Sequence, residues 1–151
     1  MKRLEKIAQL TDNQLCYGVL KYLGYPIYVC DDHDEASPHC WPGNDKVTQL
    51  AREGSVVIVG LQGELHVETA DTSVPVKIQN IVAAHLDDLV NRDAVRHISV
   101  DAAGQYVVGT IISMDPEMTC QVHGSDLYKA LCYGFLLYHC GTSLDVPDVL
   151  A

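Results

Sequence analysis

Two segments near opposite ends of the chain share six of eight residues, and this repeat constrains the fold more than any other feature. Residues 15–22 read LCYGVLKY and residues 131–138 read LCYGFLLY. Each segment is apolar at helical spacing and predicts a buried helix. Gly18 and Gly134 sit in the middle of these helices, where glycine costs about 1 kcal/mol relative to alanine. We therefore expect the two helices to lie side by side, with another backbone approaching each glycine closely.

The repeat has two explanations, an internal duplication or the independent convergence of two buried helices, and the sequence leaves both open. If the helices share one sheet face, they present the edges of four tyrosines, Tyr17, Tyr22, Tyr133 and Tyr138. The same glycine-bearing helices could also join two copies of the chain, so a homodimer through Gly18 and Gly134 is one predicted assembly.

The rest of the pattern predicts an α+β fold. Helices are expected at 11–24, where Thr11 and Gln14 form a capping box, and at 44–54, 78–89 and 125–141. In the helix expected at 78–89, one face forms an apolar stripe, made by Ile78, Ile81, Val82, His85, Leu86 and Leu89. Strands are expected at 25–30, 55–59, 64–69, 97–101 and 105–112, with a loop at 114–123. Paired strands predict a mixed or antiparallel sheet of about five strands covered by about four helices, as an α-β-α layered sandwich.

A chain of 151 residues is the usual size of one domain, and 48% hydrophobic residues are enough for a core. The pattern predicts a single domain over residues 1–141 and a loosely attached tail over 142–151. The N-terminal residues carry a charge every few positions rather than a signal-peptide pattern, and no apolar run is long enough to span a membrane. We therefore expect a cytoplasmic protein whose cysteines are thiols.

The charge balance excludes one class of partner. Twenty acidic residues against ten basic ones give a formal net charge of −10, which argues against direct binding of nucleic acid. The densest acidic run is Asp31, Asp32, Asp34 and Glu35, close to the single tryptophan, Trp41. Such a run is typical of a solvated loop, or of a surface that attracts a basic protein partner.

The layout resembles the NinX-like or phage ABA-sandwich family of small phage and prophage proteins. The resemblance is carried by residues 12–15 and 23–25, by 41–45 leading to Leu50 and 54–58, by the strand 106–110 and by the final helix, 130–136. It implies a phage-encoded or prophage-encoded accessory protein with an α-β-α layered fold, located in the host bacterial cytoplasm. It brings no catalytic residue with it.

Two groups of residues suggest enzymatic chemistry. Zinc accepts ligands of the types found at Cys30, His33, His39 and Cys40, but their spacing is unlike that of structural zinc sites, so the prediction is no cofactor. His97 and Ser99 match one H-x-S element of a two-histidine phosphodiesterase, in which paired histidines supply a general acid and a general base. His123 would begin the second element, which lacks the expected apolar positions.

The sequence favours a non-enzymatic accessory protein that binds a basic host protein, with Asp31, Asp32, Asp34, Glu35 and Trp41 as the binding residues. The expected partner is a defence or nucleic-acid-handling complex. A metal-dependent or two-histidine phosphodiesterase acting on nucleotide signals is one alternative. A homo-oligomeric structural or regulatory protein is the other.

Overall fold

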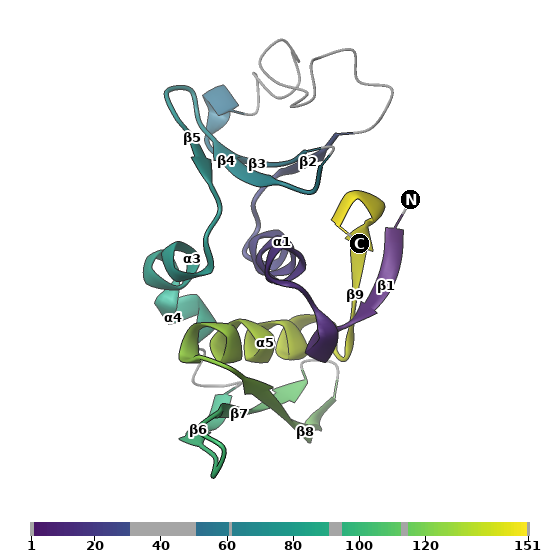
Figure 1. The fold of residues 1–151 in the computed structure, drawn as a ribbon, viewed down its shortest axis with the longest axis vertical. Coiled ribbons are helices and arrows are strands. Elements are labelled where there is room, and N and C mark those ends of the chain that lie inside the picture. The colour runs from purple at the N-terminus through teal and green to yellow at the C-terminus, as the bar shows by residue number, and fades with distance from the viewer. Residues whose placement is uncertain (1, 31–50, 61, 91–94, 113–114, 151) are drawn as a thin grey trace.

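The computed structural model describes residues 2–30, 51–60, 62–90, 95–112 and 115–150, and its strands form three sheets (Figure 1). The four-stranded sheet has the order β2-β3-β4-β5, comprising Ile27–Val29, Val56–Val59, Leu65–Glu68 and Ser73–Pro75. In it, β2 is parallel to β3 and the other pairs are antiparallel. The second sheet is antiparallel, with β6, β7 and β8 at Val95–Val100, Tyr106–Ile112 and Asp115–Gly124. The third pairs β1 with β9, Lys2–Lys6 and Ser143–Pro147.

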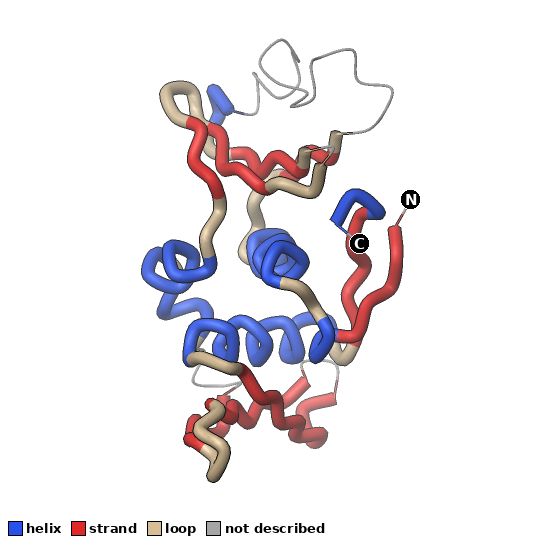
Figure 2. Tube along the Cα trace, viewed as in Figure 1, coloured by secondary structure: helices blue, strands red, loops and turns tan. Residues whose placement is uncertain are grey.

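Residues 51–53 are helical and lie on the outer side of the four-stranded sheet, whereas the other helices lie between the two larger sheets (Figure 1). These other helices are α1, α3, α4 and α5, at Asp12–Tyr22, Ile78–Ala84, Leu86–Leu89 and Leu127–Cys140. Figure 2 shows α1 next to the four-stranded sheet and α5 next to the three-stranded one, with the β1–β9 pair at one side. Two short 3₁₀ turns, η1 (Ile7–Gln9) and η2 (Asp148–Leu150), complete the described elements.

The α+β class is confirmed, but the arrangement of layers differs from the expected one. In place of one sheet of about five strands covered by helices, the described strands form separate sheets with helices between them (Figure 1). The physical reason lies in α5, whose residues from Ala130 to Leu137 are nearly all buried. A helix that is apolar on most of its circumference buries more of its surface between two layers than against one.

The two glycine-bearing helices do pack against each other, and side chains rather than backbone approach the glycines. A Cβ atom added at Gly18 would lie 2.6 Å from Cδ2 of Leu144 and 3.0 Å from Cδ1 of Leu136. A Cβ added at Gly134 would lie 3.0 Å from Cγ1 of Val108. The packing reason for both glycines is therefore intramolecular, and the homodimer expected through them stays a prediction.

The residues after Gly141 are part of the core, in contrast to the expected loose tail. Leu144, Val146 and Leu150 are buried, and β9 pairs with β1 along its length. The buried side chain of Gln14 holds the end of the chain, because its Nε2 donates a hydrogen bond of 2.9 Å to the carbonyl of Leu150. Its Oε1 accepts a hydrogen bond of 2.9 Å from the backbone N–H of Thr11, so the predicted capping box is confirmed.

Two expected elements differ from the structure. The helix expected over 78–89 is interrupted at His85, whose φ of −128° and ψ of 29° lie outside the helical region. The ring Nε2 of His85 lies 2.8 Å from the hydroxyl oxygen of Tyr25, a contact with a distant residue. Residues 115–124 form β8 instead of the expected loop, because pairing with β7 stabilises a strand of low intrinsic β-propensity.

Candidate functional site

Most of the binding and metal-ligating residues expected from sequence fall in one segment. That segment, residues 31–50, lies outside the described residues. It contains Asp31, Asp32, Asp34, Glu35 and Trp41, together with the zinc candidates His33, His39 and Cys40. Their predicted roles therefore remain predictions.

The fourth zinc candidate, Cys30, is placed by the structure. It is buried and disulfide-bonded, so it has no thiolate to offer a metal ion, and the expectation of a thiol at this position is wrong. Cys16, Cys132 and Cys140 are free thiols, as expected. Within the described part of the chain, no group of three or more His, Cys, Asp or Glu residues is arranged to hold a metal ion.

The phosphodiesterase candidates lie in the three-stranded sheet. Ser99 on β6 pairs with Val107 on β7, and Val107 pairs with His123 on β8, so Ser99 and His123 occupy one cross-strand row. The backbone of His97 is in register with Gly109, two rows away and beyond the row of Ile98 and Val108. Ser99 and His123 are exposed. The sheet therefore brings the two predicted elements within two rows of each other, although β8 ends at Gly124, before the serine of the second element.

A cavity of about 580 Å³ lies where the C-terminal ends of α1 and α5 meet α4. We call it the α1–α4–α5 pocket. Helix α1 and its cap contribute Tyr22 and Leu23, and α5 contributes Phe135 and His139. Helix α4 contributes Asp87 and Asp88, and its C-cap residue, Val90, also lines the pocket. This volume is within the usual range of ligand sites.

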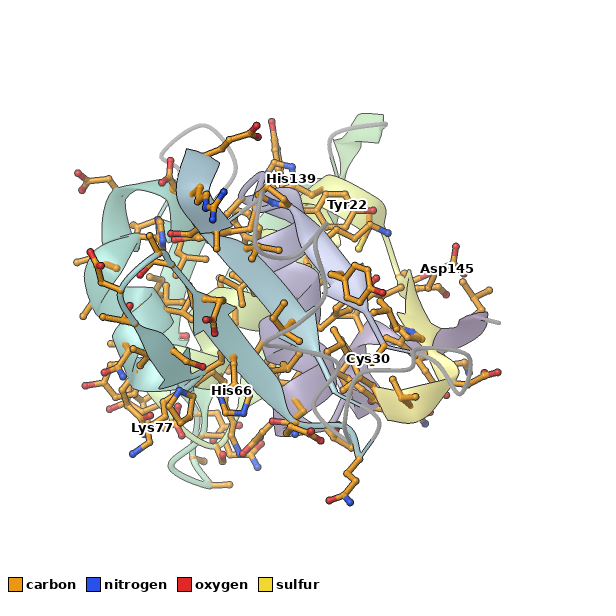
Figure 3. The ribbon with its side chains drawn as sticks, turned by 90° about the horizontal axis from the view of Figure 1, so that it is seen from above. Tyr22, Cys30, His66, Lys77, His139 and Asp145 are labelled. Carbon is orange, nitrogen blue, oxygen red and sulfur yellow. The ribbon has the colours of Figure 1, made fainter. Side chains whose placement is uncertain are left out.

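Aromatic rings line one side of the α1–α4–α5 pocket. The rings of Tyr22 and His139 are stacked, with centroids 5.9 Å apart and planes inclined by 22°. The ring of Phe135 lies 4.4 Å from that of His139. Figure 3 shows Tyr22 and His139 next to each other, far from Cys30 and His66. The two helices that carry the repeat therefore each contribute an aromatic side chain to this pocket, from positions that are not equivalent in the repeat.

The charge of the α1–α4–α5 pocket is negative. Asp87 and Asp88 are exposed, and none of the described lining residues is a lysine or an arginine. Burial lowers the pKa of His139 below its usual 6.5, so its ring is neutral at pH 7. The C-terminal turns of α1 and α5 both reach the pocket, and a helix C-terminus carries a partial negative charge. The pocket thus favours a cation with a flat or apolar body.

A cation from the chain itself already lies beside these rings. Nζ of Lys21 is 5.8 Å from the centroid of the Tyr22 ring, within the range of a cation–π contact. One face of the Tyr22 ring is therefore accessible to a positive charge.

Sequence reasoning identified Tyr22 as a partly exposed ring but did not find the pocket. Asp87 and Asp88 were expected only on the solvent side of a long helix, and His139 belonged to no expected site. The available signal was partial: Tyr22 ends the first repeat in the last turn of α1, whereas His139 follows the second repeat in the last turn of α5. The contact between these turns depends on tertiary packing.

No protein-family model, curated protein sequence or solved structure matches this chain. The resemblance to the phage family therefore remains a prediction. Across the described residues, the helices are too short or too polar to cross a lipid bilayer.

Proposed function

We propose that this protein acts by binding a partner protein through acidic side chains that complement a basic surface. The observation that carries the proposal is the α1–α4–α5 pocket, which Asp87 and Asp88 line together with Tyr22 and His139 from the C-terminal turns of two helices. The net charge of −10 adds a longer-range attraction that accelerates encounter with a cationic partner. The resemblance to phage accessory proteins would make that partner a host protein of a defence or nucleic-acid-handling complex.

The run Asp31, Asp32, Asp34 and Glu35 supplies a second acidic element in this proposal. It lies a few residues before Trp41, the single tryptophan of the chain. Aromatic residues next to charge are typical of binding surfaces. Trp41 also provides a spectroscopic probe of this segment, because its fluorescence reports on this one position.

Binding of a fluorescent polylysine or polyarginine peptide, followed by anisotropy, tests the proposed function. We expect binding at low ionic strength that weakens steeply as salt is added, and no binding of a neutral glycine-serine peptide of equal length. Replacing the four acids by Asp31→Asn, Asp32→Asn, Asp34→Asn and Glu35→Gln should weaken binding and reduce any change in Trp41 fluorescence. Failure of both polybasic peptides to bind at low salt would contradict the proposal.

The register of the three-stranded sheet favours a second candidate function, a two-histidine phosphodiesterase acting on nucleotide signals. The supporting observation is that Ser99 and His123 flank Val107 in one row, with His97 in register with Gly109 two rows away. Paired histidines on one sheet face would supply the acid and the base for cleavage of a phosphodiester. Incubation with cyclic dinucleotides and trinucleotides should then consume them, and His97→Ala or His123→Ala should abolish the loss. Intact substrates after prolonged incubation would exclude this candidate.

A further inference from the structure

We infer that the α1–α4–α5 pocket binds an arginine side chain of the partner polypeptide. This inference rests on the proposed function and specifies its ligand chemistry. Three independent features of the pocket point to a cation with a planar head: the carboxylates, the ring faces and the two helix ends. Each contributes a different part of the recognition.

The carboxylates supply the charge and the hydrogen-bond acceptors. Asp87 and Asp88 follow each other in α4 and both line the cavity. A guanidinium group presents five N–H donors in a fixed fork, which can bond two carboxylate oxygens at once. A lysine ammonium has three donors around a single point and forms no such paired contact.

The ring faces supply the preference for a planar group. Tyr22 and His139 are stacked on each other with their planes inclined by only 22°, and Tyr22 is 37% exposed, so a planar group can extend this stack on the outer face of Tyr22. Guanidinium groups stack on aromatic faces, and the methylene stem of arginine gains contact with apolar walls such as Leu23 and Val90. The cavity volume of about 580 Å³ leaves room for the whole side chain.

Lys21 provides a test of this inference, because its charge can be removed by substitution. Its ammonium lies over the ring of Tyr22, so it would compete with an incoming cation for contact with this ring. Removing this charge should therefore help an arginine to bind. Lys77 offers a matched control, because it is exposed and lies at the opposite side of the molecule from Tyr22 and His139 in Figure 3.

The test is an NMR titration of the full chain with a glycine-serine peptide that carries one arginine. Matched peptides carry lysine, or citrulline, which keeps the shape of arginine without its charge. We expect the arginine peptide to shift the signals of Tyr22, Phe135 and His139, and to bind about fivefold more tightly than the lysine peptide. The citrulline peptide should produce no saturable shift.

Variants assign the binding to the pocket. Asp87→Asn together with Asp88→Asn should weaken arginine binding about tenfold, whereas Asp71→Asn, an exposed acid in another turn, should change it less than about twofold. Lys21→Gln should tighten binding and Lys77→Gln should leave it unchanged. Tyr22→Leu should remove the preference for arginine over lysine while weak binding of both persists.

The outcomes distinguish a failure of the arginine site from a failure of the proposed function on which it rests. Equal binding of arginine and citrulline peptides, or equal effects of the paired variant and Asp71→Asn, would overturn the arginine site. If polybasic peptides still bind in that case, the proposed function stands and its surface lies elsewhere. If polybasic peptides also fail to bind, the proposed function fails as well.

Discussion

Gly18 and Gly134 show how single residues permit the close packing of this protein. In α1, the absence of a side chain at Gly18 admits the ends of Leu136 and Leu144. In α5, the absence of a side chain at Gly134 admits Val108 from β7. The two positions are equivalent in sequence, yet they contact different layers. Each glycine lowers the helix propensity of its segment but allows a neighbouring aliphatic side chain to pack more closely.

Gly18→Ala should lower the free energy of unfolding by about 1–2 kcal/mol. The added methyl group gains helix propensity but collides with Leu144 and Leu136, and overpacking outweighs that gain. Urea denaturation measures the change. The matched control is Gly54→Ala, because among the described residues nothing beyond its chain neighbours lies within 4 Å of an added Cβ there, and its effect should stay within about 0.5 kcal/mol. Equal effects of the two substitutions would contradict this account of the packing.

At the scale of elements, contacts between residues distant in sequence determined the structural features that local sequence patterns did not predict. Thr11 and Gln14 predict the start of α1 correctly, but the same Gln14 side chain also binds the carbonyl of Leu150. The apolar stripe over 78–89 is real, yet His85 leaves the helical conformation where it meets Tyr25. This break makes α4 a separate short helix and determines the placement of its acidic residues, Asp87 and Asp88.

Gln14→Met should destabilise the protein by about 2–4 kcal/mol and loosen its C-terminal segment. Methionine keeps the size of the side chain but leaves the N–H of Thr11 and the carbonyl of Leu150 without this partner. Hydrogen exchange should show lower protection in β9 as well as at the start of α1. Gln79→Met, at an exposed position of α3, serves as the control and should have little effect. Unchanged exchange in β9 would show that Gln14 does not hold the chain end.

At the scale of the whole molecule, two sheets enclose a helical layer that contains titratable side chains. Burial raises the pKa of Cys16 and of Cys132 from the ordinary 9.0 to about 12. Burial also raises the pKa values of Tyr17 and Tyr133 above 10.0. At the pocket the shift is in the other direction, since burial lowers the pKa of His139. The folded state therefore resists ionisation of these groups at both ends of the pH scale.

Stability should fall as the pH rises above about 9. There the thiols of the unfolded chain ionise while those of the folded chain stay protonated until about pH 12, so unfolding releases protons. The slope should approach about 1.4 kcal/mol per pH unit for each buried thiol. Urea denaturation between pH 8 and 10.5 measures it, and Cys16→Ala with Cys132→Ala should flatten it. An identical slope in this variant would contradict the assignment to the thiols.

The lowered pKa of His139 reduces stability as the pH falls, whereas the thiols reduce it as the pH rises. Below its ordinary value of 6.5 the unfolded chain takes up a proton that the folded chain resists, so its contribution to stability is lost as the pH falls. Comparing the wild type with His139→Gln between pH 7 and 5 isolates this contribution from that of the carboxylates. The wild type should lose more stability than the variant over this interval.

The sequence by itself determined the local structure of about half of the described elements and the acidic character of the protein. Capping residues, helical stripes and β-branched runs predicted α1, α5, β2, β3, β4 and the β6–β7 pair, because these signals depend on neighbours along the chain. The tertiary structure alone decided the order of layers, the anchoring of residues 143–150, the strand β8 and the α1–α4–α5 pocket. Each of these depends on contacts between residues distant in sequence, such as Tyr22 with His139 or Gln14 with Leu150. Local periodicity predicts which face of an element is buried, but the partner of that face is chosen by packing in three dimensions.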